Sequence, residues 1–295
     1  MSERQERRER RERRPVGEVC VLKIGGSVLT EKGTADKGTE KRARKSEIKR
    51  IAEEIALALS CHEQRGKGLV LVHGAGSYGH PQAKRYLASR DPRDALVTHE
   101  SAKELNRMVV GSLVQAGLKA VPIHPLSGVV SKRGAKGREL KYKIKEQIKM
   151  ALKMRIIPVL HGDIIFDEEQ GFRILSGDQV VVYAAKEVAK EFGARAVKVG
   201  VGSDVDGVLS GGREGEGEVV RELTPADAER ERKRKSIKGS GHLDVTGGMR
   251  EKVRLLAKLA DESKIPSLLF NAARERNVYK FLTDDETLLG TEIIK

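Results

Sequence analysis

Short runs of continuously apolar residues, separated by longer amphipathic segments, set the tightest limit on how this chain can fold. The runs are rich in Val, Ile and Leu and lie at residues 19–24, 68–73, 120–124, 156–162 and 196–201. Such runs, without polar alternation, are typical of strands buried on both faces. Apolar residues at helical spacing predict helices at 48–59, 98–116, 140–154, 179–192 and 247–264. The alternation of the two patterns predicts an α/β fold with a mainly parallel central sheet.

Two segments depart from this alternation. Residues 162–178 hold two short apolar runs on either side of Asp-Glu-Glu-Gln-Gly, a pattern that predicts a β-hairpin. Residues 211–241 are rich in glycine and in charged residues, so we expect a surface excursion before the last helix.

The charge balance and the cysteine content narrow the class of protein. A formal net charge of +14 favours anionic partners such as nucleotides, phosphorylated metabolites, nucleic acid or an acidic membrane surface, without choosing among them. The chain has only 2 cysteines, Cys20 and Cys61, so no disulfide framework is predicted. No apolar run approaches the roughly 18 residues that a membrane-spanning helix needs. The N-terminus also lacks the apolar core of a secretory signal, so we expect a cytoplasmic protein without membrane insertion.

Residues 1–17 form a low-complexity arm in which glutamates alternate with pairs of arginines as far as Pro15. A segment with no hydrophobic face cannot bury enough apolar surface to offset the entropy of ordering. We therefore predict a disordered basic arm. Contact of this arm with nucleic acid or with another partner stays an open alternative.

The first predicted strand ends in a glycine turn that begins with a lysine and is followed by a second lysine. The turn comprises Lys23, Gly25, Gly26 and Ser27, and Lys32 follows shortly after it. Paired glycines let backbone N–H groups approach an anion closely, and the lysines place cations beside it. Taken alone, the turn fits either a phosphate site or an ordinary strand end.

The second predicted strand ends in a longer glycine turn between His73 and His80. This turn contains Gly-x-Gly-x-x-Gly, as dinucleotide-binding proteins do, but the expected acidic residue at the end of the next strand is missing. The nearest candidate, Glu100, falls in a predicted helix. His80 follows three glycines, where a histidine can donate a hydrogen bond to a phosphate oxygen. We interpret the turn as a phosphate cradle and His73 as structural, with a dinucleotide-dependent oxidoreductase as the alternative.

Further turns pair glycine with polar residues at the ends of predicted strands or helices. They are Gly162-Asp163, Gly177-Asp178, residues 203–208 and residues 244–249. The Asp-x-Asp-Gly of the third turn lacks the closing glutamate of a calcium loop, so calcium is not expected. The chain also has no Gly-x-x-x-x-Gly-Lys-Ser/Thr motif, which excludes a P-loop enzyme. Together the turns predict a site assembled at one edge of the sheet.

Taken in order, these turns resemble those of the amino acid kinase superfamily, and among its members they are most similar to the isopentenyl phosphate kinases. The resemblance runs from about residue 19 to the C-terminus and rests on KIGGS, HGAGSYGH, HGD, SGD, SDVDGV and DVTGGM. It implies an open three-layer αβα sandwich, with an acceptor lobe at 18–175 and an ATP lobe at 176–295. The implied reaction uses ATP and Mg²⁺ to phosphorylate isopentenyl phosphate, a small isoprenoid, in isoprenoid biosynthesis. A homodimer is the implied assembly.

The resemblance also implies roles for individual residues. His80 would bind the acceptor phosphate, helped by the backbone at Ala75 and Gly162. Lys32 would stabilise the transferring phosphoryl group and, with Lys23 and His80, would make up the catalytic set. The implied ATP-binding residues are Lys23, Gly25, Gly26, Ser27, Gly76, Asp204, Gly248 and Lys252. No residue is implied as a direct metal ligand.

Three residues depart from the pattern of the superfamily. Ala75 stands where glycine is frequent, Tyr78 where phenylalanine is frequent, and Ser203 where threonine is frequent. His80 is also a feature of fosfomycin kinases, so a phosphonate kinase is the nearest alternative function. A non-catalytic nucleotide-binding relative is the other alternative, although the retained lysines argue against it.

A phosphate monoester is already ionised near pH 7, so the acceptor needs alignment and relief of repulsion more than a general base.

Overall fold

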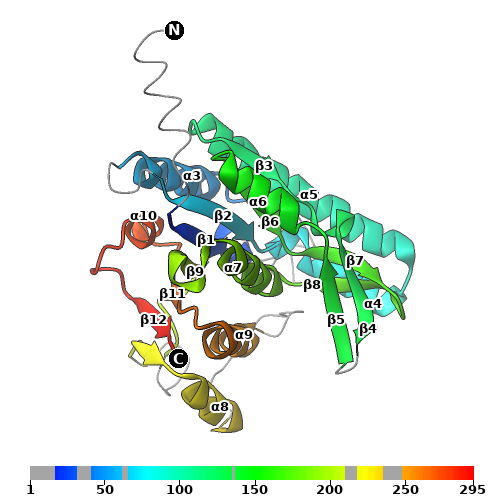
Figure 1. Ribbon diagram of the computed structural model, residues 1–295. Coiled ribbons are helices and arrows are strands. Elements are labelled where there is room, and N and C mark those ends of the chain that lie inside the picture. The colour runs from blue at the N-terminus through cyan, green and yellow to red at the C-terminus, as the bar shows by residue number, and fades with distance from the viewer. Residues whose placement is uncertain (1–16, 32–40, 62–65, 135–136, 210–217, 235–247) are drawn as a thin grey trace.

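A mainly parallel sheet forms the middle of the molecule (Figure 1). The computed structural model describes residues 17–31, 41–61, 66–134, 137–209, 218–234 and 248–295. The strands of this sheet are β1 (Val19–Ile24), β2 (Gly68–His73), β3 (Ala120–Pro122), β6 (Ile157–His161), β9 (Val197–Ser203), β10 (Glu222–Leu223), β11 (Ser267–Asn271) and β12 (Gly290–Ile293). Their order is β10-β12-β11-β9-β1-β2-β6-β3, and only β11 and β12 pair antiparallel.

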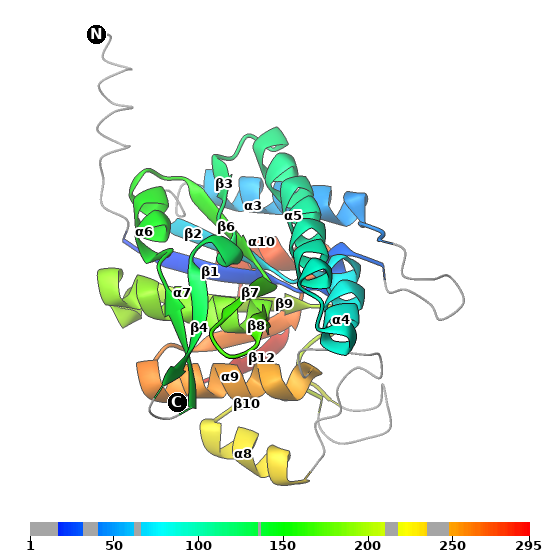
Figure 2. The same ribbon diagram turned by 90° about the vertical axis from the view of Figure 1, so that its right-hand side faces the viewer.

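Helices cover both faces of this sheet, which confirms the predicted three-layer αβα sandwich (Figures 1 and 2). One face carries α3 (Lys45–Ser60), α5 (Pro92–Gln115) and α10 (Asn277–Leu282). The other face carries α6 (Lys145–Lys153), α7 (Gly177–Phe192) and α9 (Gly248–Ser263). The remaining helices are α2 (Gly26–Leu29), α4 (His80–Ser89) and α8 (Pro225–Arg234), with short 3₁₀ turns η3 (Gly76–Tyr78), η4 (Pro125–Ser127) and η5 (Ala194–Ala196).

A second, smaller sheet lies near α4 (Figure 1). Its strands are β4 (Val129–Gly134), β5 (Gly137–Tyr142), β7 (Asp163–Asp167) and β8 (Gly171–Leu175), in the order β5-β4-β7-β8. The β7–β8 pair is antiparallel and confirms the predicted hairpin. The pairing of β4 with β7 is parallel, and it joins the two hairpins of this sheet.

The structure corrects the predicted boundaries of two helices. The segment expected to be helical from residue 140 begins as strand β5, and α6 starts only at Lys145. Leu140 and Tyr142 are two residues apart and both pack against the large core, which is the spacing of a strand rather than of a helix. The helix expected from residue 98 starts at Pro92, because the Asp91 carboxylate caps it by accepting a hydrogen bond from the Arg93 N–H at 2.9 Å.

The stretch expected as a surface excursion lies only partly within the described residues. It contains β10 and the helix α8. Residues 210–217 and 235–247 lie outside the described residues. Among the helices that are described, none is long and apolar enough to cross a membrane.

Alternate residues of β1 enter different cores, as the absence of polar alternation predicts. Val19 and Val21 pack in the core that includes residues of α7 and α9. Cys20, Leu22 and Ile24 pack in the core that includes residues of α3, α5 and α10. The central strand is therefore buried on both faces, and its carboxyl end is held firmly in place.

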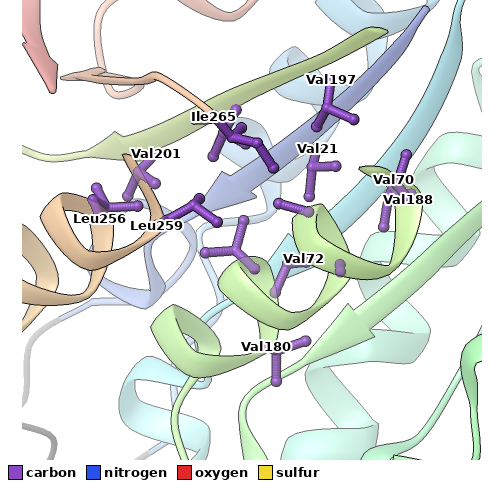
Figure 3. Close-up of a cluster of buried hydrophobic side chains, with 14 of the residues drawn as sticks. Val21, Val70, Val72, Val180, Val188, Val197, Val201, Leu256, Leu259 and Ile265 are labelled. Carbon is purple, nitrogen blue, oxygen red and sulfur yellow. The ribbon is translucent and has the colours of Figure 1, made fainter. Parts of the chain in front are cut away.

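Close packing of helices on the sheet depends on small residues in β9. Figure 3 shows Val201 of β9 beside Leu256 and Leu259 of α9. On the opposite face, a Cβ atom on Gly200 would lie only 2.4 Å from the Phe281 ring of α10. Glycine at this position lets the aromatic ring lie directly on the sheet.

A buried carboxylate joins α3 to the C-terminal part of the chain. Glu54 is 8% exposed, and its two oxygens accept hydrogen bonds from the backbone N–H groups of Arg276, Val278 and Tyr279 at 2.8, 3.1 and 3.1 Å. These donors lie at the start of α10, where first-turn amides have no intrahelical partner. Glu54 thus acts as a cap supplied by another helix, and Arg50 donates to it at 2.5 Å.

Candidate active site at the carboxyl edge of the sheet

The glycine turns meet because the strands that precede them are parallel. A Cβ atom on Gly26 would lie 2.3 Å from the nitrogen of Gly76, and one on Gly74 would lie 2.6 Å from the nitrogen of Gly26. A Cβ atom on Gly162 would lie 3.0 Å from the nitrogen of Gly177. No side chain fits such approaches, so glycine is required where the backbones touch. We call this cluster the glycine hub, made up of Gly25, Gly26, Gly74, Gly76, Gly162 and Gly177.

The first turn forms the start of α2. Gly25 occupies the N-cap position, and Gly26 and Ser27 form the first turn of the helix. The Gly25 N–H donates to the Gly202 carbonyl at 2.8 Å, which anchors the turn to the end of β9. Amides in the first turn of a helix have no intrahelical acceptor, and they are the groups that bind phosphate in proteins.

Thr30 links the first turn to the second. Its buried hydroxyl donates to the Gly26 carbonyl at 2.8 Å and accepts from the Ser77 N–H at 3.0 Å. The turns therefore cannot move independently without breaking this bridge. Sequence reasoning missed Thr30, because a lone threonine gives no sign that its hydroxyl lies against a turn 47 residues away.

Lys23 forms an ion pair with Asp178 at the hub. The ammonium lies 2.6 Å from the carboxylate, with side chains only 6% and 16% exposed. Asp178 lies in the first turn of α7, where the helix dipole favours a negative charge. A Cβ atom on Gly177 would lie 3.2 Å from the Lys23 Cε, so the lysine stem lies along the hub. The sequence singled out the Gly177-Asp178 turn without predicting this pairing.

The second turn leads into α4. Ala75 has φ −83° and ψ −21°, so this residue has no need of glycine, and its departure from the pattern of the superfamily causes no strain. The positive φ, +51°, falls on Gly76. His80 is the first residue of α4 and is partly buried. A Cβ atom on Gly79 would lie 2.3 Å from that of Ala75, so the turn is tightly folded just before His80.

Gly162 is in the hub, but its N–H already has a partner. It donates to the His73 carbonyl at 2.9 Å, an interaction between the ends of β6 and β2. The predicted contact of this backbone with an acceptor phosphate would require the bond to be shared. The assignment of Gly162 to the acceptor therefore stays a prediction.

The predicted ATP-binding residues outside the hub lie at the same edge of the sheet. Asp204 directly follows β9. Gly248 and Lys252 lie in the N-terminal part of α9. Since α9 leads directly into β11, which runs parallel to β9, the start of α9 lies toward the carboxyl ends of these strands. Residues 244–247 of the predicted turn lie outside the described residues.

Lys32 and most of the basic arm fall outside the residues that the structure describes. The chain on either side of Lys32 is placed: the Glu31 N–H donates to the Arg42 carbonyl at 2.9 Å. Thr30 forms an isolated bridge with Ala43 beside the hub. The role given to Lys32 and the disorder of residues 1–16 both stay predictions.

Four histidines and one aspartate form a polar cluster close to the second turn. This cluster was not predicted from the sequence. Its members come from the ends of β2 and β6, the start of β7, the segment before η4, and α5; they are His73, His99, His124, His161 and Asp163. We call this group the histidine chain. The only sequence signal was that His73, His124 and His161 each stand at or just beyond the end of a predicted strand.

Burial keeps three imidazoles of the histidine chain neutral, those of His73, His124 and His161. It lowers the pKa of His73 to about 3, with a further contribution from His161. It lowers the pKa of His124 to about 4, again with a contribution from His161. The pKa of His161 is lowered by burial as well, although Asp163 opposes the shift. These three rings therefore bring polar groups close to the hub without adding positive charge.

No group of three or more histidine, cysteine, aspartate or glutamate side chains suited to a metal ion occurs within the described residues. The described residues supply the Lys23 ammonium held by Asp178, the backbone amides of the first turn of α2, and His80 at the start of α4. These groups suit the binding of phosphate anions more than direct coordination of a metal.

Known proteins are similar to this chain in both sequence and fold. The sequence model of the amino acid kinase family matches residues 18–271. An isopentenyl phosphate kinase of Methanocaldococcus jannaschii is 32% identical over 283 residues, covering 92% of this chain and 97% of that protein. One of Haloferax volcanii is 37% identical over 244 residues, covering 81% and 87%. An X-ray structure of isopentenyl phosphate kinase matches with a TM-score of 0.73 and 26% identity, covering 93% of this chain and 100% of that one. These similarities confirm the resemblance that the glycine turns indicated.

Proposed function

This chain belongs to the amino acid kinase family, and on that premise we propose that it transfers the γ-phosphoryl group of ATP to the phosphate of isopentenyl phosphate. The products would be isopentenyl diphosphate and ADP. The relatives from M. jannaschii and H. volcanii, both isopentenyl phosphate kinases, support this choice of acceptor.

The observation that carries the proposal is that the two turns predicted to bind phosphate meet in one hub. The turn after β1 brings the Lys23 ammonium, held at 2.6 Å by Asp178. The turn after β2 brings His80 at the start of α4. Gly26 and Gly76 touch between them. A donor phosphate on one turn and an acceptor phosphate on the other would be adjacent, as direct phosphoryl transfer requires.

The residues of the hub fit a reaction limited by positioning and charge. Lys23 would neutralise charge on the phosphoryl group in transit, and Asp178 would keep its ammonium aimed at the hub. His80 would hold the acceptor phosphate by donating a hydrogen bond. Lys32 would supply the second cation. No side chain needs to remove a proton, because the acceptor is ionised near neutral pH.

ATP and Mg²⁺ are the cofactors we propose. Asp204, Gly248 and Lys252 lie at the carboxyl edge of the C-terminal part of the sheet and would bind the nucleotide. Mg²⁺ bound together with the nucleotide would neutralise part of the charge on the phosphates.

The acceptor's hydrocarbon tail needs an apolar surface beside His80. A small separate core lies among α4, α5, η4, β7 and β8 and consists of Tyr86, Ala95, Leu126, Ile164 and Phe172. Tyr86 lies on the same helix as His80 and donates its hydroxyl to the Phe172 carbonyl at 2.9 Å. We assign the tail to this side of the hub, and we propose that the acceptor lobe spans 18–175 and the ATP lobe 176–295.

A homodimer is the assembly we propose, with the cytoplasm as its location. Strand β3 pairs only with β6 among the described strands, so it is an edge of the sheet. Val114 of α5 and Val121 of β3 are exposed near that edge. An apolar sheet edge is a surface that a second copy can cover. Light scattering on the purified protein tests this assembly, and a mass of one chain would contradict it.

An assay of ADP release across four acceptors tests the function. The acceptors are isopentenyl phosphate, dimethylallyl phosphate, fosfomycin and glycerol phosphate, each with Mg-ATP. We expect the highest kcat/KM with isopentenyl phosphate. A preference for fosfomycin would replace the proposal by a phosphonate kinase. Binding of ATP without turnover of any acceptor would favour the non-catalytic relative, and a melting-temperature shift with NAD alone would revive the dinucleotide alternative.

A further inference from the structure

The hydrogen bonds of the histidine chain define which nitrogen of each ring carries the proton. The Asn106 side-chain nitrogen lies 3.0 Å from His73 Nε2 and 3.5 Å from the Val159 carbonyl. A carbonyl only accepts, so this atom is the amide nitrogen and donates to His73 Nε2. The other ring nitrogen, His73 Nδ1, therefore carries the proton and donates to the Gly74 carbonyl at 3.1 Å.

The same logic applies to His161. Its Nδ1 lies 2.9 Å from the Gly162 carbonyl, which can only accept, so Nδ1 carries the proton. Its Nε2 must then accept, and His124 Nδ1 donates to it at 2.8 Å. Both strand-end histidines are thus neutral Nδ1–H tautomers that donate to the carbonyl of the next residue.

The far end of the chain is anchored by a carboxylate. His99 Nδ1 lies 2.9 and 3.0 Å from the two oxygens of Asp163, whose side chain is completely buried. Asp163 also accepts from the backbone N–H groups of Ile164 and Leu126 at 2.8 and 3.3 Å. Besides the members of the chain, Lys103 of α5 is the charged group that acts on His124 and His161.

These donations fix the orientation of two peptide planes in the hub. The described backbone has no cis peptide bond, so in the Gly74–Ala75 peptide the carbonyl and the N–H point in opposite directions. With the Gly74 carbonyl held toward the His73 ring, the Ala75 N–H must point away from the core. Within the described part of the chain that N–H makes no hydrogen bond.

We propose that His73 and His161, held as Nδ1–H tautomers by Asn106 and His124, lock these peptide planes so that the Ala75 N–H faces the acceptor phosphate. Asn106, His124 and both strand-end histidines are then positioning residues that act through the backbone without touching the substrate. His161 holds the Gly162–Asp163 plane in the same way, and so maintains the close approach of Gly162 to Gly177. The link to the acceptor rests on the proposed function; the tautomers do not.

Neutral rings suit this task better than charged ones. A cationic His73 would carry a second N–H facing the Asn106 donor, and the Asn106–His73 hydrogen bond would be lost. A cationic His161 would likewise face the His124 donor. The lowered pKa values of both rings keep this from happening near neutral pH.

NMR of the ¹⁵N-labelled imidazoles of the unliganded protein tests the tautomers directly. At pH 7 we expect the signals of His73 and His161 to be those of neutral rings protonated at Nδ1. Rings protonated at Nε2, or doubly protonated rings, would overturn the proposal whatever reaction the protein catalyses. This readout needs no substrate, so it is independent of a failure of the proposed function.

Steady-state kinetics with isopentenyl phosphate test the link to the acceptor. Asn106→Asp replaces the donor by an acceptor in the same shape, and we expect the acceptor KM to rise about tenfold while the ATP KM and kcat stay within about twofold. Equal increases in the acceptor KM and the ATP KM would indicate general damage to the site and overturn the positioning role. If the variant does not fold, the tautomer measurement on the unmodified protein still decides.

A matched pair of variants tests the part of the histidine chain that orients the Gly162–Asp163 peptide plane. His124→Asn keeps an N–H donor near the position of Nδ1, whereas His124→Leu removes it. We expect His124→Leu to raise the acceptor KM about fivefold and His124→Asn to restore most of that loss. Equal behaviour of the two variants would overturn the role of the His124 donor. An unmodified protein that does not phosphorylate isopentenyl phosphate would instead contradict the proposed function.

Discussion

The two flanks of the glycine hub hold their polar groups in opposite ways. On the α7 flank, a lysine and an aspartate are both charged and meet at 2.6 Å. On the α5 flank, His73, His124 and His161 are kept neutral, and both strand-end histidines donate to backbone carbonyls. The comparison teaches that a site for two phosphates needs charge where a phosphoryl group moves, and a fixed backbone where a phosphate only has to be held.

The flanks also differ in what burial costs them. A buried ion pair loses hydration on both partners, and removing one partner leaves an uncompensated charge. Neutral imidazoles avoid that cost at neutral pH but incur it as soon as they must be protonated. The ion-paired flank should therefore be sensitive to substitution, and the histidine flank should be sensitive to acid.

Acid should break the histidine flank first, with the largest effect on stability. The folded-state pKa of His73, about 3, lies below the ordinary value of 6.5, so between these values the unfolded chain binds more protons. Stability is thus full above pH 6.5 and is lost as pH falls toward 3. In the limit the loss from this residue is on the order of 5 kcal/mol.

Urea unfolding at several pH values between 6.5 and 5 measures this loss, because most carboxylates stay ionised there. As pH falls through this range, the slope should approach about 1.4 kcal/mol per pH unit for each histidine that is neutral only when folded. A free energy of unfolding that stays constant over this range would show that the buried histidines are not neutral.

Lys23→Met should break the ion-paired flank and lower kcat roughly 10³-fold, about 4 kcal/mol, since a fixed cation at a developing charge contributes this much. Asp178→Asn should cost about tenfold, because the ammonium remains but loses its orientation. Lys186→Met is the control: Lys186 pairs with Glu262 on the surface, and we expect no change in kcat. A Lys23→Met enzyme with normal kcat would place the phosphoryl group elsewhere.

His80→Ala should lower kcat/KM for the acceptor roughly 10²-fold, about 3 kcal/mol of lost positioning and charge. The matched control is Lys84→Ala, an exposed position on the same helix that should leave kcat/KM within about twofold. An unchanged kcat/KM for His80→Ala would remove this residue from the site.

Glu54→Gln tests a buried carboxylate outside the hub, one that we expect to contribute to stability and not to catalysis. The amide keeps one acceptor oxygen and cannot satisfy all three N–H groups at the start of α10. We expect a loss of about 2 kcal/mol in the free energy of unfolding, with kcat unchanged. Glu53→Gln is the control, because its ion pair with Lys49 is exposed, and a loss as large as that of Glu54→Gln would contradict the capping role.

The sequence was sufficient to predict the sandwich and the edge at which the site lies. Apolar runs without alternation identify strands buried on both faces, and glycines directly after them identify the turns. The predicted start of α6 was wrong because Leu140 and Tyr142 belong to strand β5, whose pairing with β4 depends on the tertiary fold. Helical spacing over a short window cannot distinguish this case.

What the sequence could not predict was which side chains meet across the hub. The Lys23–Asp178 pair joins residues 155 positions apart. The bond from His124 to His161 spans 37 positions, and its direction depends on a neighbouring carbonyl. Such contacts are set by the register of parallel strands, which a single sequence does not contain.

The central claim is that the hub binds two ligands at separate places, the acceptor beside His80 (the acceptor flank) and the nucleotide beside Lys252 (the nucleotide flank). Calorimetric titration of two variants tests it most directly. For His80→Ala, we predict that isopentenyl phosphate binds at least about tenfold more weakly while the non-hydrolysable nucleotide AMP-PNP, with Mg²⁺, binds as before. For Lys252→Ala, we predict the reverse. Equal weakening of both ligands by either variant, or an exchange of the two effects, would contradict the division of the hub into an acceptor flank and a nucleotide flank.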